Sequence, residues 1–182
     1  MRDEALGQAL LRIARNAIGE RFGLAPRAVD ALPELSASGA TFVTLTQNGQ
    51  LRGCIGSLEA RRPLAADVAE NAVAAAFRDA RFAPLAAGEL AHTRVEVSLL
   101  SPAEPFACHD EADALAHLRP GIDGLILTHG RHRATFLPQV WEALPEPRHF
   151  LAQLKLKAGL PADFWDGQIE LARYGVEKWK ET

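Results

Sequence analysis

The sequence predicts an α+β fold in which helices flank an antiparallel sheet. Helical and strand-like patterns are mixed along the 182 residues, without the regular alternation of a βαβ protein. Strand-like segments come in pairs joined by short turns, which is typical of antiparallel hairpins. The chain has no internal repeat, low-complexity segment or long linker, so residues 1–182 are expected to form a single domain.

The first element is predicted to be an amphipathic helix between Asp3 and Gly23. Asp3 is a residue type that caps helix N-termini, and Gly23 is the type that ends them. The apolar residues recur at the spacing of one helix face. They are Leu6, Leu10, Ile13, Ala17 and Ile18.

The clearest hairpin is predicted over residues 40–57. Its first part is rich in β-branched and aromatic residues, which favour strands. Asn48 and Gly49 follow, and this dipeptide is the strongest short signal for a type I′ turn, because both central residues need a positive φ. If they form a two-residue loop, Gln47 pairs with Gln50.

That loop also predicts a register for the hairpin. Counting back from the turn, Val43 is expected opposite Cys54. Arg52 and Cys54 would then lie on the same face of the hairpin as Val43 and Leu45.

Further elements are expected along the rest of the chain. Pro63 can begin a helix over 63–79, because proline is favoured in the first turn. Clean alternation over 92–100 predicts a strand, and 110–118 reads as a short helix.

The C-terminal part adds a second hairpin, two helices and a last strand. The hairpin is expected over 124–136, and the helices over 138–144 and 148–159. Residues 167–179 read as one strand, in which Gly175 is expected to form a bulge.

Composition and charge indicate an ordinary globular protein. Hydrophobic residues make up 48% and charged residues 24% of the chain, and the formal net charge is −3. This charge provides no general attraction to nucleic acid or to acidic membranes.

The cysteine count and the N-terminus predict a cytoplasmic location. Two cysteines are too few for a disulfide framework, so reduced thiols are expected. The N-terminus lacks the apolar core of a signal peptide, and no apolar run approaches the roughly 18 residues of a membrane span.

Cys54 has two interpretations. Free cysteine is among the most buried residue types, so it can be a packing residue, and Gly53 and Gly56 can mark close packing around it. Alternatively, Cys54 is a reactive thiol whose pKa is lowered by the neighbouring Arg52 guanidinium. The sequence leaves both interpretations open.

Three other charged positions also have two interpretations. Glu96 lies on the polar side of a predicted strand, where it is either solvated or an acid–base group in a cleft. Asp79 and Arg81 either pair with each other or bind a ligand. The histidines lack zinc-site spacing, so no metal or other cofactor is expected.

The hexapeptide LRGCIG, Leu51 to Gly56, carries a resemblance. In chain order it is accompanied by FVTL, DARF, EVSLLSPAEP, GIDGLIL, ATFLPQVW and FLAQLKLKAGLP. Together these segments resemble the AMMECR family, whose prokaryotic members are called AmmeMemoRadiSam system protein A. The similarity spans nearly the whole chain. One departure is Ala80, where the family has proline.

The resemblance implies a fold and a set of candidate residues. Both chain ends would build a larger lobe around an antiparallel sheet, with a smaller lobe inserted between them. Cys54 and Glu96 are the candidate catalytic residues. The candidate binding residues are Arg52, Gly53, Gly56, Asp79, Arg81, Thr135 and Gln139.

The resemblance does not imply a particular reaction. It associates the chain with Memo-like and radical S-adenosylmethionine proteins, and so with a modification pathway. The first hypothesis is therefore an enzyme or enzyme component acting on a small molecule, in a cleft lined by LRGCIG. A non-catalytic ligand- or protein-binding module is the alternative. Nucleic-acid binding is the hypothesis that the charge supports least.

Overall fold

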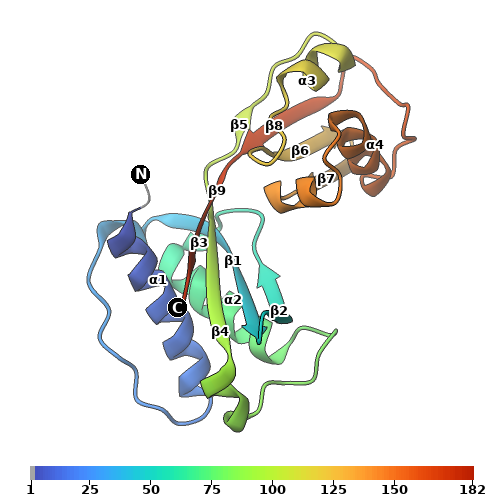
Figure 1. The fold of residues 1–182 in the computed structure, drawn as a ribbon. Coiled ribbons are helices and arrows are strands. Elements are labelled where there is room, and N and C mark those ends of the chain that lie inside the picture. Colours follow the sequence, from blue (N-terminus) through green and yellow to red (C-terminus); the bar gives the residue numbers. More distant parts are fainter. Residues whose placement is uncertain (1–2) are drawn as a thin grey trace. The chain divides into compact units, whose positions relative to one another are not determined.

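The computed structural model describes residues 3–182, which form two compact units. Unit 1 runs to Leu100 and also contains Glu177–Thr182, and unit 2 is Ser101–Val176. Both described chain ends therefore belong to unit 1 (Figure 1). The fold is a mixture of helices and antiparallel sheets, as the sequence predicts.

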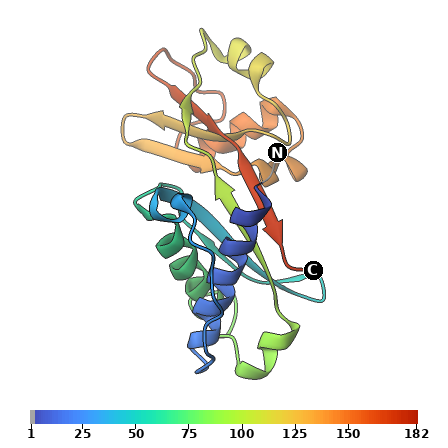
Figure 2. The same cartoon turned by 90° about the vertical axis from the view of Figure 1, so that its left-hand side faces the viewer.

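Unit 1 contains a sheet with two helices on one of its faces. Its strands run in the order β2-β1-β4-β9, and β3 pairs with the start of β1. The elements are α1 (Glu4–Glu20), η1 (Pro33–Ser36), β1 (Ser38–Gln47), β2 (Gln50–Gly56), β3 (Arg62–Pro63), α2 (Leu64–Phe77), η2 (Ala87–His92), β4 (Arg94–Leu100) and β9 (Val176–Lys180). Figure 2 shows the two helices lying along the sheet.

The core of unit 1 lies between this sheet and the helices α1 and α2. Val43, Leu45, Val95 and Val97 are fully buried on the sheet side. The α1 residues that face them include Leu10, Ala14 and Ile18, as the apolar spacing predicts. The side chain of Asp3 accepts a hydrogen bond from the Leu6 N–H, so the predicted N-cap is confirmed.

The turn of the first hairpin is also confirmed, but its predicted register is wrong. Asn48 and Gly49 both have positive φ, and Gln47 pairs with Gln50. A β-bulge then inserts Arg52 as an extra residue of β2. From that point the pairing shifts by one residue.

The shift moves Cys54 to the other face of the sheet. Val43 lies opposite Ile55, and Thr44 lies opposite Cys54. Successive strand residues face opposite sides, so Cys54 does not share a face with Val43 and Leu45. The side chain expected beside core residues instead lies on the face away from the helices.

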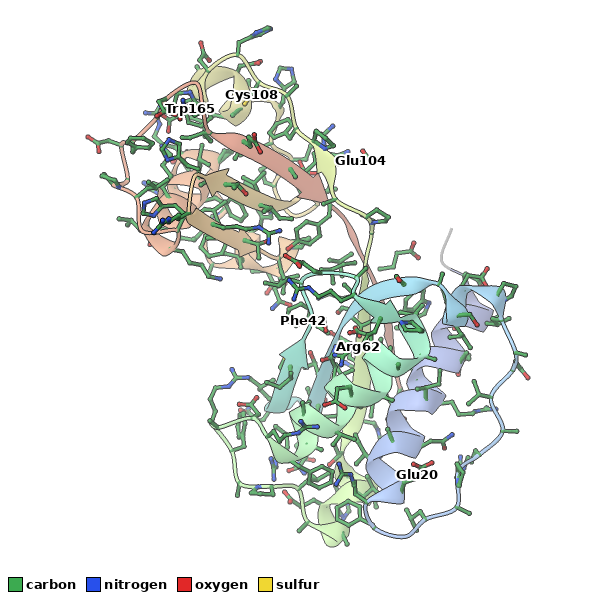
Figure 3. The ribbon with its side chains drawn as sticks, turned by 180° about the vertical axis from the view of Figure 1, so that it is seen from behind. Glu20, Phe42, Arg62, Glu104, Cys108 and Trp165 are labelled. Atoms are coloured by element: carbon green, nitrogen blue, oxygen red, sulfur yellow. The ribbon has the colours of Figure 1, made fainter. Side chains whose placement is uncertain are left out.

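Unit 2 has its own sheet and its own core. The strands run in the order β5-β8-β6-β7, and the core includes Trp141, whose ring stacks on Phe150 at 3.7 Å between centroids. The elements are β5 (Glu104–Pro105), α3 (Glu111–His117), β6 (Gly124–His129), β7 (His132–Phe136), η3 (Pro138–Glu142), α4 (Pro147–Lys157) and β8 (Glu170–Tyr174). Figure 3 labels Cys108 and Trp165 among its side chains.

The predicted last strand is two strands. β8 ends at Tyr174 and belongs to the sheet of unit 2, whereas β9 begins at Val176 and belongs to the sheet of unit 1. Gly175 lies between them, so it does not form a bulge within one strand. The Gly175 N–H donates to Ser101 Oγ at 2.8 Å, and the Ser101 N–H donates to the Gly175 carbonyl at 2.9 Å.

Candidate functional site

Four polar side chains form a row across the sheet of unit 1, which we call the polar row. Thr44 on β1 pairs with Cys54 on β2 and with Glu96 on β4. Lys178 on β9 follows, with its Nζ 4.0 Å from Glu96 Oε1. The polar row lies on the face that the helices do not cover, because the core residues Val43 and Leu45 occupy the alternate positions.

Cys54 is partly exposed and contacts Thr44 directly. Its Sγ lies 3.2 Å from Thr44 Oγ1, and either atom can be the donor. Glu96 is the next residue along the row. Since neighbouring strands are about 4.8 Å apart, the backbones of Cys54 and Glu96 are separated by about 10 Å. Thr44 lies between them and is the group that touches the thiol.

The loop after α2 holds the main chain of Cys54. β2 is the edge strand of the sheet, so Cys54 has backbone groups that no neighbouring strand binds. The Cys54 N–H donates to Asp79 Oδ2 at 2.9 Å, and Arg81 Nη2 donates to the Cys54 carbonyl at 3.4 Å. Cys54 therefore meets two candidate residues that lie 25 and 27 positions further along the chain.

Asp79 and Arg81 also pair with each other, as one of the two interpretations predicts. Arg81 Nη2 lies 2.7 Å from Asp79 Oδ2, and the Asp79 side chain is almost completely buried. The hydrogen bond from the Arg81 guanidinium, assisted by the N–H groups of Cys54 and Arg81, holds the pKa of Asp79 well below its usual range. The same bond raises the pKa of Arg81. A fixed negative charge thus lies behind the Cys54 backbone, and a partly exposed positive charge lies beside it.

Arg52 does not take the position expected for it. Its Nε lies 3.0 Å from Glu89 Oε1, and its Nη2 donates to the Ala83 carbonyl at 2.9 Å. The bulge gives Arg52 this orientation, because it removes the residue from strict alternation with Cys54. Among the described residues, the arginine that contacts Cys54 is Arg81.

Glu89 should give a recognisable pH dependence of stability. The hydrogen bond from Arg52, together with the Ala86 N–H, lowers the pKa of Glu89 to about 2. A carboxyl whose pKa is lowered on folding stabilises the protein above its unfolded pKa, and the contribution is lost as the pH falls toward the folded value. We expect Glu89→Gln to be less stable than the wild type above about pH 5, and the difference to vanish near pH 2.

Urea denaturation of both proteins across this pH range measures the difference. The matched control is Glu70→Gln, since Glu70 is also paired with an arginine but more exposed. This variant should change stability little at any pH. A Glu89→Gln difference that stays constant down to pH 2 would contradict the assignment.

The two glycines of LRGCIG are explained by packing. A Cβ on Gly53 would lie 2.1 Å from the Ala75 carbonyl oxygen of α2. One on Gly56 would lie 2.2 Å from the Phe42 ring. Neither residue has a positive φ, so space rather than backbone conformation requires glycine.

Thr135 and Gln139 lie in unit 2. Thr135 is buried on β7, and its Oγ1 is 2.9 Å from the Tyr174 hydroxyl. Gln139 is exposed in η3. Their part in the site stays a prediction.

The described residues offer no metal site at the polar row. Among residues 3–182, no three His, Cys, Asp or Glu side chains gather as they would around one metal ion. Within the same residues, no helix is long and apolar enough to cross a membrane.

Sequence reasoning missed Thr44, Glu89 and Lys178. The contact between Thr44 and the thiol depends on the bulge, which the hairpin signal does not reveal. Glu89 is 37 positions from Arg52 in the sequence and joins it only through the fold. Lys178 lies in a segment whose pattern reads as one continuous strand.

Comparisons with known proteins agree with the fold. A model of the AMMECR1 family matches residues 11–179. A protein of Methanothermobacter thermautotrophicus is 40% identical, over 99% of this chain and 95% of its own. A protein of Saccharolobus solfataricus is 38% identical, over 99% of this chain and 83% of its own. The crystal structure of an uncharacterised protein from Pyrococcus horikoshii has a TM-score of 0.82 and 34% identity, covering 100% of this chain and 93% of that one.

Proposed function

The chain belongs to the AMMECR1 family, and from this premise we propose that it is an enzyme or enzyme component with Cys54 as its nucleophile. The observation that carries the proposal is the set of polar contacts around Cys54. Cys54 is partly exposed, Thr44 Oγ1 lies 3.2 Å from its sulfur, and Asp79 and Arg81 fix its main chain. A packing cysteine needs none of these polar contacts.

In the proposed step, the Cys54 sulfur forms a bond to an electrophilic carbon of the substrate. The bond from that carbon to its leaving group breaks, and the leaving group takes the electron pair and the proton released by the thiol. The Thr44 hydroxyl donates a hydrogen bond to the thiolate and keeps its hydrogen, which stabilises the attacking form. Glu96, next in the polar row, is the acid–base group of the proposal.

The wider setting of this proposal rests on the family resemblance. We place the protein in the cytoplasm, where its two unpaired cysteines stay reduced. There it would act on a small molecule in a cleft lined by LRGCIG, in a modification pathway with Memo-like and radical S-adenosylmethionine proteins. Co-purification of tagged protein with either partner supports this setting, and its absence from both at native expression levels argues against it.

Alkylation of the two thiols tests the reactive-cysteine proposal. We expect iodoacetamide to modify Cys54 in the folded protein at neutral pH, and to modify Cys108 more slowly. Burial raises the pKa of the Cys108 thiol, with Asp113 and Asp110 adding to the effect, so Cys108 is an internal reference. Peptide mass spectrometry follows both rates in one sample.

A pair of threonine variants makes the test specific. Thr44→Val removes the hydroxyl beside the sulfur and should slow Cys54 alkylation about tenfold, the effect of one hydrogen bond to a charged group. Thr46→Val changes the next residue on the same face of β1, which pairs with Leu51, and should leave the rate unchanged. If Cys54 stays unmodified until the protein unfolds, the proposal is wrong.

The alternative function is a non-catalytic ligand- or protein-binding module. One observation favours it: Gly53 and Gly56 serve close packing, so part of the family signature is explained without chemistry. A Cys54→Ser variant separates the two. It should retain ligand or partner binding in a binding module, whereas it should abolish turnover in an enzyme.

A further inference from the structure

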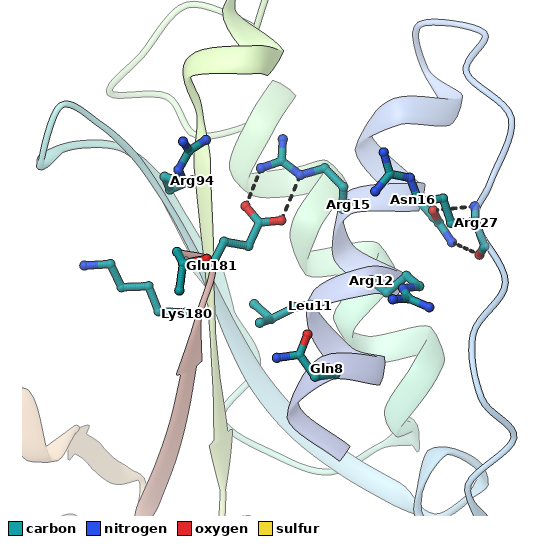
Figure 4. Close-up of a pocket in the computed structure, with 10 residues that line it drawn as sticks. Gln8, Leu11, Arg12, Arg15, Asn16, Arg27, Arg94, Lys180 and Glu181 are labelled. Atoms are coloured by element: carbon teal, nitrogen blue, oxygen red, sulfur yellow. Dashed lines mark hydrogen bonds and ion pairs between the residues drawn. The ribbon is translucent and has the colours of Figure 1, made fainter. Parts of the chain in front are cut away.

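A hollow in unit 1 lies away from the polar row, on the side of α1. It has a volume of about 390 Å³, which is within the range of small-molecule sites. Its walls come from α1, the loop that follows α1, the start of β4 and the chain at the end of β9. Figure 4 shows these residues.

The charge of this hollow is strongly positive. Five of the 20 lysines and arginines line it, and they face one acidic side chain, Glu181. The five are Arg12, Arg15, Arg27, Arg94 and Lys180. Such a concentration is unusual in a chain whose formal net charge is −3.

The single acid is already committed to Arg15. The Arg15 guanidinium holds both carboxylate oxygens of Glu181, and it also donates to the carbonyls of Leu90 and Thr93. Glu181 in turn accepts the Val95 N–H at 2.9 Å. This pair therefore builds the wall of the hollow and neutralises one cation.

The four remaining cations have no acidic partner among residues 3–182. Arg12 donates to the Ala28 carbonyl at 2.9 Å. The side chains of Arg27 and Lys180 make no hydrogen bond or ion pair within the described chain, and Arg94 reaches only the Ala91 carbonyl at 3.5 Å. Asn16 fixes the loop that carries Arg27, through hydrogen bonds of 2.9 and 2.8 Å to the Arg27 backbone (Figure 4). The loop backbone at Arg27 is thus held in place, while the charges of these cations are not neutralised.

An apolar space adjoins the cations. A further hollow of about 500 Å³ shares Arg15, Asn16, Arg27, Arg94 and Glu181 with the first. Its other walls are mostly apolar, and they include Leu24 and Leu90. Leu24 is 53% exposed, so part of its side chain is accessible to a ligand.

We propose that the two hollows together bind a small organic phosphate. Its phosphate oxygens would lie against Arg94 and Lys180, and its carbon body against Leu24 and Leu90. A carboxylate carries one charge and would leave one of these two cations unmatched, whereas a phosphate monoester carries about −1.5 to −2 at neutral pH. Guanidinium groups also match phosphate oxygens in geometry.

Titration calorimetry with phenyl phosphate, inorganic phosphate and benzoate tests the site. Phenyl phosphate should bind more tightly than either of the others, because it alone combines a phosphate with an apolar body. Arg94→Gln combined with Lys180→Gln should weaken phenyl phosphate binding at least roughly tenfold, as expected for lost charge-assisted hydrogen bonds. Arg61→Gln combined with Arg78→Gln removes two exposed arginines elsewhere in unit 1 and should leave the affinity unchanged.

Leu24→Ser examines the apolar part separately. It should weaken phenyl phosphate binding and leave inorganic phosphate binding as it was. The proposal would be overturned if the Arg94→Gln, Lys180→Gln variant and its control bound phenyl phosphate equally well. It would also be overturned if the wild type did not bind phenyl phosphate at about millimolar concentration. A single-stranded oligonucleotide that binds where phenyl phosphate fails, with a steep loss of affinity in salt, would assign the surface to nucleic acid instead. None of these outcomes depends on the reactivity of Cys54.

Discussion

Replacing Asp67 by alanine is expected to destabilise the protein by about 3–5 kcal/mol, the usual cost of removing one partner of a buried charged network. Asp67 lies in α2 and is 1% exposed. Its Oδ2 accepts from the Thr41 N–H, the Thr41 hydroxyl and the Asn71 amide, at 2.7–3.0 Å. Its Oδ1 accepts from Ser57 Oγ at 2.7 Å and from Arg62 Nε at 2.9 Å.

The cost is large because every partner is left behind. Thr41 is fully buried, and without the carboxylate its N–H and its hydroxyl lose their acceptor. The Asn71 amide keeps a bond to the Thr41 carbonyl at 3.0 Å. Arg62 would also lose its counter-charge. The midpoint of thermal unfolding should fall by about 10 °C for a protein of this size.

Circular dichroism during urea and thermal denaturation measures this loss. Glu70→Ala is the matched control, since it removes an exposed carboxylate of the same helix that pairs with Arg78, and it should cost less than about 1 kcal/mol. Asp67→Ala and Glu70→Ala proteins of equal stability would show that the buried network contributes nothing net.

Gly53→Ala is expected to cost about 3 kcal/mol, at the upper end of the range for overpacking. The added Cβ would lie 2.1 Å from a carbonyl oxygen of the α2 backbone, and a backbone atom cannot rotate away as a side chain can. Relief requires a shift of α2 or of β2. A shift of β2 would also disturb Cys54, which follows Gly53 directly.

Gly88→Ala provides the control for this substitution. Gly88 lies in η2, where an added Cβ would have no atom within 4 Å, and its φ is not positive. The variant should be as stable as the wild type or slightly more so, because alanine lowers the entropy of the unfolded chain. Denaturant midpoints compare the two, and a tolerated Gly53→Ala would contradict the close approach of α2.

Features that depend on neighbouring residues in the chain are those that the sequence predicts well. Asp3 caps α1 through an N–H three positions away, and Asn48 with Gly49 forms its turn without help from distant residues. Both are set by the local backbone requirements of their residue types.

The register of the hairpin depends on distant residues, so the local pattern predicts it wrongly. The bulge at Arg52 is accompanied by a pair with Glu89, by the approach of Gly53 to Ala75 and by the hold of Asp79 on Cys54. Of these contacts, the close approach at Gly53 leaves a signal inside the hairpin, the glycine itself, but a glycine does not reveal the register. The same holds at Gly175, where the alternating pattern continues although the strand changes sheets.

The candidate site is also predicted only in part from the sequence. The family resemblance points to Cys54, Asp79 and Arg81, which the fold brings together. Arg52 is only two positions from Cys54, so the sequence makes it the expected partner of the thiol. In the structure its long side chain pairs with Glu89 instead. Residue type alone does not determine which of several acids an arginine meets.

The position of β9 at the end of the chain has a consequence for synthesis on the ribosome. All of unit 2 emerges before the last strand of unit 1 does. Until then, β4 has an open edge, Gly7 lacks the Trp179 ring that packs against it, and Arg15 lacks Glu181, 166 residues away. Unit 1, whose synthesis begins before that of unit 2, can therefore complete its sheet only after unit 2 has been made. A nascent chain stalled before β9 exposes the edge of β4, which can pair with other chains.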